Sequence, residues 1–161
     1  MTSETLFVTT AINSWKQIVA QIDKGLASSS DEDLQREVAP GKNRVYYLLG
    51  HLTAVHDLML PVLRVGDRLY PELDEEFLTK PDRTFPESRT NAADLKRAWS
   101  TVNEKLNAAF ANLSPQQWLE RHNSISEDDF AKEPHRNRLS VLLSRTNHNS
   151  FHAGQMRLVS K

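Results

Sequence analysis

Histidine is the residue type in this sequence whose spacing could support chemistry. The chain has six histidines and no cysteine, so a transition-metal site would have to be built from imidazoles and carboxylates. His148 and His152 are four residues apart, and on a helix this places both rings on one face, about 40° and one turn apart. Two imidazoles at that spacing can reach one metal ion. A surface-facing or hydrogen-bonded pair is the alternative that the spacing alone leaves open.

A metal site would need a further ligand from another part of the chain. No glutamate lies between His148 and His152, so the base of an HEXXH metalloprotease is missing. His51 and His56 are the candidates for the third ligand, and on one helix they lie about 140° apart, so both cannot point into the same site. Helix geometry does not choose between them. His56 could equally be a histidine at the edge of the core, hydrogen-bonded to a backbone carbonyl.

Four stretches with apolar residues at helical spacing must position these side chains. They cover residues 4–27, 43–65, 91–113 and 138–158. No stretch shows the alternation of a half-buried strand. Mostly polar connections cover residues 66–90 and 114–137. The pattern predicts an all-α four-helix bundle in a single domain, residues 1–161, with long connections between the second and third and between the third and fourth helices.

Details of the second and third stretches refine this expectation. Asn43 and Asn91 are the expected N-caps of their helices. The apolar side chains of residues 43–65 cover an arc of about 200°, which is wide enough to contact two neighbouring helices. A face this wide is also compatible with a homodimer.

Composition excludes several classes of function. Twenty basic residues face 21 acidic ones, so no broad basic field exists for nucleic acid. No apolar stretch approaches the roughly 20 residues of a membrane-spanning helix, and the N-terminus is acidic where a signal peptide is basic. Phosphate-binding glycine loops and the G-x-S-x-G nucleophile elbow are missing from the sequence. We therefore expect a cytoplasmic protein without nucleic-acid or membrane partners.

Two short motifs resemble those of a known family. Residues 50–52, GHL, are similar to the gHL motif on the second helix of the DinB/YfiT-like superfamily. Residues 147–155, NHNSFHAGQ, are similar to the nHxxxHxGQ motif on that family's fourth helix. The Gly41-Lys42 dipeptide before the second helix and the layout of residues 91–118 also resemble the family. The likeness covers nearly the whole chain.

The resemblance carries expectations about fold and site. It implies a bundle with up-down-down-up connectivity and a divalent metal held by three histidines. Carried over residue by residue, the metal ligands are His51, His148 and His152, which favours His51 over His56. Some family members transfer low-molecular-weight thiols such as bacillithiol or mycothiol, and others are described as hydrolases. A small-molecule substrate is therefore expected, and a non-catalytic or stress-related binding protein with a vestigial site is the alternative.

The chemistry of such a site follows from its ligands. Three neutral imidazoles leave a divalent ion its full charge and at least one open position, as in catalytic zinc sites. A bound water would be acidified and a bound thiol held as thiolate, so both hydrolysis and thiol transfer are reasonable. Imidazole suits several metals; zinc and nickel are the first expectation, with iron and manganese as further candidates.

Several polar residues near the motifs have two interpretations each. Gln155 lies on the face of His148 and His152 and could fix a ligand tautomer, or could be an ordinary polar contact at the helix end. Arg145 could attract an anionic substrate group, although an exposed arginine is the simpler expectation. For Asp57 we expect a solvated carboxylate. His122 and His135 lie in the last connection and are expected to be solvated. That connection could border the site.

Overall fold

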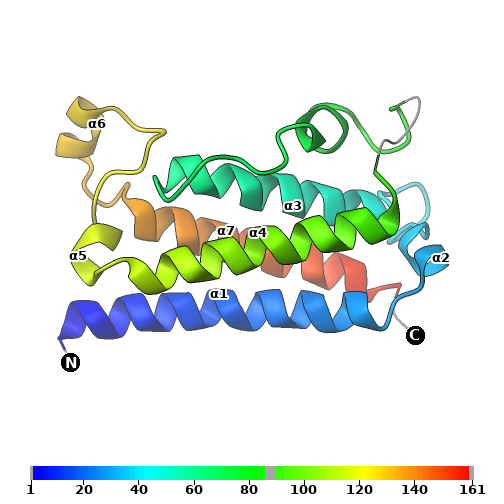
Figure 1. The fold of residues 1–161 in the computed structure, drawn as a ribbon, viewed down its shortest axis with the longest axis horizontal. Coiled ribbons are helices and arrows are strands. Elements are labelled where there is room, and N and C mark those ends of the chain that lie inside the picture. The colour runs from blue at the N-terminus through cyan, green and yellow to red at the C-terminus, as the bar shows by residue number, and fades with distance from the viewer. Residues whose placement is uncertain (1, 86–89, 160–161) are drawn as a thin grey trace.

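The computed structural model describes residues 2–85 and 90–159 of the chain. These residues are mostly helical and contain no strand, which confirms the all-α prediction. The long helices lie beside one another: α1 (Ser3–Ala27), α3 (Val45–Val62), α4 (Ala92–Asn112) and α7 (Arg138–Arg157). Helices α1 and α7 run in one direction and α3 and α4 in the other (Figure 1).

Short elements occupy the segments between the long helices. They are α2 (Asp31–Leu34), the π-helix η1 (Glu75–Thr79), α5 (Pro115–Trp118) and α6 (Glu127–Lys132). Isolated bridges pair Glu37 with Arg44 and Arg121 with Asn137. The connection that contains η1 passes over α3 (Figure 1), and this placement matters for the site.

Local sequence sets most of the helix ends. The Asn91 side chain accepts from the backbone N–H of Asp94, as expected for the cap of α4. Asn137 caps α7 in the same way. The expected cap at Asn43 is wrong, because Arg44 is the N-cap residue of α3 and makes no capping side-chain bond. Helix α3 is shorter than the predicted 43–65 at both ends.

The core fills the space between the long helices. Its largest fully buried side chains are Trp15, Trp99, Trp118, Phe77 and Phe110. Packing is most extensive between α1 and α7 and between α3 and α4, while α3 and α7 share a smaller contact. Helix α4, η1 and α7 together cover the wide apolar arc of α3. This arc is therefore used within the chain, and the homodimer stays a prediction.

No helix in the described part of the chain is both long enough and apolar enough to cross a bilayer.

Candidate metal centre

Three histidines from two helices converge at the seam between α3 and α7. Nε2 of His148 lies 3.1 Å from Nε2 of His51 and 3.0 Å from Nε2 of His152. The candidate ligand atoms all lie within 4.8 Å of one another. Because α3 supplies His51 and α7 supplies the other two, the relative position of these helices fixes the cluster. The structure thus brings together the three residues that the resemblance singled out.

The second ring nitrogens of His51 and His152 have defined partners. His51 Nδ1 donates to the backbone carbonyl of Phe77 at 3.0 Å. His152 Nδ1 lies 2.7 Å from Oε1 of Gln155, which accepts its proton. A proton on each Nδ1 leaves the Nε2 lone pair free and aimed at the common centre. Gln155 therefore contacts a candidate ligand directly, which is the first of its two interpretations.

The cluster fits a tetrahedral cation. Nitrogen atoms bound to one zinc ion at about 2.0–2.1 Å would lie roughly 3.3 Å apart, close to the separations observed here. Lone pairs this near to one another repel unless a proton or a cation lies between them. Nδ1 of His148 is buried and has no hydrogen-bond partner in residues 2–85 and 90–159. The donor set and its spacing are those of an open three-histidine site.

Burial favours the neutral form of two rings of the cluster. Together with smaller contributions from the charges of His152 and His51, it lowers the pKa of His148 to about 4. Burial also lowers the pKa of His152, although the hydrogen bond with Gln155 opposes this change. Neutral imidazole is the form that binds metals, so these two rings are in the binding form at neutral pH.

A glycine and a π-helix position His51. A Cβ atom added at Gly50 would lie 2.2–2.5 Å from carbon atoms of the Phe77 ring, which is far inside contact distance. The absence of a side chain at Gly50 therefore lets η1 pack directly on α3, where the carbonyl of Phe77 reaches His51. Sequence reasoning missed Phe77, which lies in the long connection. The only signal was the glycine beside His51.

Comparisons with known proteins bear on the fold and the family of the chain. The structure is similar to the crystal structure of a conserved protein from Enterococcus faecalis, with a TM-score of 0.65 and 18% sequence identity over 99% of this chain and 98% of that chain. At this identity the likeness shows the fold alone. The family model of the DinB superfamily matches residues 15–156. The chain belongs to the DinB superfamily. No curated protein matches the sequence.

In this member of the DinB superfamily, His56 lies outside the cluster. It is fully buried, with its ring between those of Trp15 and Trp99 at centroid distances of 4.6 and 4.7 Å. Nδ1 and Nε2 lie 2.9 and 2.8 Å from the side-chain oxygens of Asn103 and Asn149, in place of the expected backbone carbonyl. Burial lowers the pKa of His56 to about 4. Its role is to join α3, α4 and α7 inside the core.

The solvated carboxylate expected at Asp57 is wrong. Asp57 is fully buried and accepts a hydrogen bond from Nε of Arg68 at 2.7 Å. It also accepts from the backbone N–H groups of Leu69 and Tyr70. The carboxylate therefore holds the start of the long connection against α3. The sequence could not predict this role, because the connection has no apolar periodicity that would indicate its path.

The remaining polar residues differ in their surroundings. His135 is exposed, as expected, whereas His122 is half-buried and accepts a hydrogen bond from the backbone of Ser124. Arg145 is half-buried, so the expectation of an exposed side chain is wrong for it. None of these three residues belongs to the histidine cluster.

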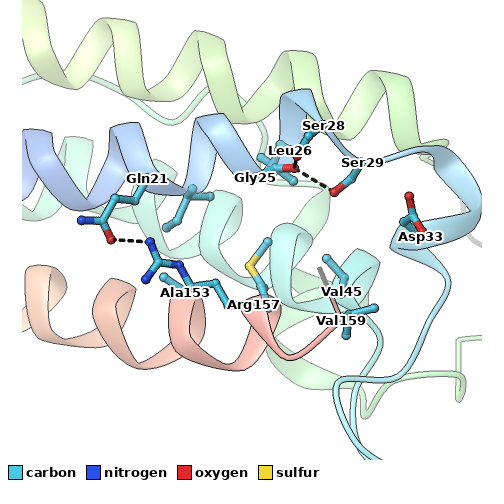
Figure 2. A pocket seen from close by; sticks show the side chains of 12 residues that line it. Gln21, Gly25, Leu26, Ser28, Ser29, Asp33, Val45, Ala153, Arg157 and Val159 are labelled. Carbon is cyan, nitrogen blue, oxygen red and sulfur yellow. Dashed lines mark hydrogen bonds between the residues drawn. The ribbon is translucent and has the colours of Figure 1, made fainter. Parts of the chain in front are cut away.

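A cavity lies away from the histidine cluster. It has a volume of about 230 Å³ and opens between the C-terminal ends of α1 and α7, where both aliphatic side chains, such as Ile22 and Leu26, and polar ones, such as Asp33, line it. Figure 2 shows Arg157 on α7 reaching Gln21 on α1 across this cavity, with a hydrogen bond of 3.3 Å. No histidine lines it. The cavity and the histidine cluster are thus separate features of the α7 helix.

Proposed function

We propose that the protein binds one divalent metal ion through His51, His148 and His152, with zinc or nickel as the first candidates. We further propose that the four long helices form the up-down-down-up bundle implied by the resemblance. The short distances from Nε2 of His148 to Nε2 of His51 and of His152, 3.1 and 3.0 Å, support the metal site. Partners on Nδ1 of His51 and His152 support it further, because such contacts orient metal-binding imidazoles.

The activity that this site supports best is a metal-dependent transfer of a low-molecular-weight thiol to a small molecule, or hydrolysis of one. A bound metal would supply a deprotonated nucleophile at neutral pH, from either a thiol or water. The chain itself contributes three neutral ligands, which leave the full positive charge of the ion in place. Phe77 and Gln155 contribute orientation, since each holds the proton of one ligand ring away from the centre.

Two model reactions with the zinc-loaded protein test this proposal. We expect faster conjugation of 2-mercaptoethanol to 1-chloro-2,4-dinitrobenzene, or faster hydrolysis of 4-nitrophenyl acetate, than with the metal-free protein. His152→Ala should lose the acceleration, and the exposed His135→Ala should keep it. Metal binding without acceleration of either reaction would favour the non-catalytic alternative. An acceleration that persists in His152→Ala would contradict the proposed site.

A further inference from the structure

Arg145 shares a helix face with the candidate metal ligands. It precedes His148 by three residues and His152 by seven along α7. At 3.6 residues per turn it therefore points about 60° from His148 and about 20° from His152. The side chain is half-buried. Its side chain thus leaves α7 on the same side as His148 and His152, one turn nearer the start of the helix.

Among the described residues, Arg145 differs from the comparable arginines in having no hydrogen-bond or ion-pair partner. The other buried or half-buried arginines in residues 2–85 and 90–159 donate to protein oxygen atoms; they are Arg44, Arg68, Arg121 and Arg138. Within the same ranges Arg145 makes no hydrogen bond or ion pair. A cation partly removed from water without a counter-charge is unfavourable. An anion from outside the chain would relieve that cost.

The charges at a metal-loaded cluster would favour an anion. Three neutral imidazoles would not reduce the charge of a bound divalent ion, and Arg145 adds a second positive charge on the same side of α7. In the part of the chain that the structure describes, no carboxylate belongs to the cluster. A loaded site would therefore suit an anionic ligand.

We propose that Arg145 binds the carboxylate of a small substrate whose reacting thiol or acyl group meets the metal site. This inference rests on the proposed function and narrows its substrate class. A guanidinium matches a carboxylate with two parallel N–H···O bonds, and a partly desolvated guanidinium gives up less hydration on forming them. Arg145 is thus a specificity-determining residue, and the carboxylate is the group it selects.

The test compares two thiols of equal length on the cobalt-substituted protein. 3-Mercaptopropionate carries a carboxylate where 3-mercaptopropanol carries a hydroxyl, and each is titrated by its thiolate-to-cobalt absorption. We expect wild type to bind 3-mercaptopropionate about tenfold more tightly than 3-mercaptopropanol. Arg145→Gln should bind both alike, and Arg145→Lys should keep part of the preference. Arg145→Gln should bind cobalt at least as tightly as wild type, since a positive charge is removed.

Arg157→Gln is the matched control, because it removes the same charge from the same helix. Arg157 lies about 140° from His152 around α7 and contacts Gln21 on α1 instead. The preference for 3-mercaptopropionate should remain in this variant. Equal affinity for the two thiols in wild type, or a preference that persists in Arg145→Gln, would overturn the inference while leaving the metal site intact. Failure of wild type to bind cobalt would contradict the proposed function and this inference together.

Discussion

At the scale of single residues, the candidate site depends on groups that are not ligands. His51 has its ring fixed by a carbonyl of a distant segment, and that segment can approach only because Gly50 has no side chain. His152 is fixed by Gln155, one turn later on its own helix. One imidazole is thus oriented by tertiary packing and another by local helix geometry. The first should be the more sensitive to mutation.

Gly50→Ala tests the packing that orients His51. An alanine in a helix is normally more favourable than glycine by about 1 kcal/mol. Here the added methyl group would meet the Phe77 ring, so we expect destabilisation by about 1–3 kcal/mol and weaker zinc binding. Urea unfolding and zinc titration measure the two effects. Gly25→Ala, with no atom within 4 Å of the new methyl group, should be stabilised instead. Similar stability gains in both variants would contradict this account of Gly50.

His56 gives the metal-free protein a pH-dependent stability. Its pKa is lowered from 6.5 to about 4 in the folded state, so the unfolded chain binds the proton more readily. Stability should be constant above about pH 6.5 and fall at lower pH, by up to about 1.4 kcal/mol per unit, until about pH 4. His148, His152 and His122 act in the same direction. The comparison is therefore made in the His148→Ala background, where the contributions of His152 and His122 are common to both proteins. There, His56→Gln should reduce the slope of stability against pH measured by urea unfolding, and an unchanged slope would contradict this account of His56.

At the scale of elements, α3 organises the region around the site. It carries His51 and His56, packs against α4, and supports η1 through Gly50. Asp57 near its C-terminal end holds the chain that leads toward η1. The long connection is therefore held to α3 at two places. At one, the buried carboxylate of Asp57 accepts hydrogen bonds from the backbone of the connection, and at the other the Phe77 ring packs on Gly50.

Asp57→Asn tests the first of these fastenings. Losing the charge leaves the half-buried Arg68 with only Asp74 as its partner and replaces one acceptor oxygen by a donor. We expect a loss of about 3 kcal/mol in the free energy of unfolding, as for other broken buried ion pairs. Asp67→Asn, an exposed neighbour in the same connection, should change stability by less than about 0.5 kcal/mol. Equal effects in chemical denaturation would show that the buried carboxylate does not hold the connection.

At the scale of the whole molecule, periodicity predicts the long helices well. An apolar stripe at 3.6-residue spacing requires a partner surface, and the four stripes find it in one another. The predicted 4–27 and 138–158 each end within a residue of α1 and α7. The start of α3 differs because no side chain caps it, so its boundary depends on the chain before it rather than on a local signal.

The candidate site was less accessible to sequence reasoning than the fold. Helix geometry could not choose between His51 and His56, since each lies on an acceptable face of α3, and only the motif resemblance separated them. Tertiary packing decides the surroundings of three further residues. The path of the long connection determines where Phe77 packs and why Asp57 is buried, and contacts between helices determine the half-burial of Arg145. Residues 66–90 have no apolar period, so the sequence offered no signal for where that segment packs.

The molecule as a whole places its candidate ligands where two long helices share only a small contact. Helices α3 and α7 contact each other less than α1 and α7 or α3 and α4 do. His51 and His148 face each other across this seam. A metal held there would join the two helices, so that the same three side chains would serve both the stability of the bundle and the chemistry of the site.

Metal content of the untagged protein tests the central claim most directly. Plasma mass spectrometry of wild type, His148→Ala and the exposed His135→Ala measures it after purification and zinc or nickel loading. The account predicts about one equivalent of metal in wild type and in His135→Ala, and almost none in His148→Ala. Less than about a tenth of an equivalent in wild type after loading, or equal metal in wild type and His148→Ala, would contradict it.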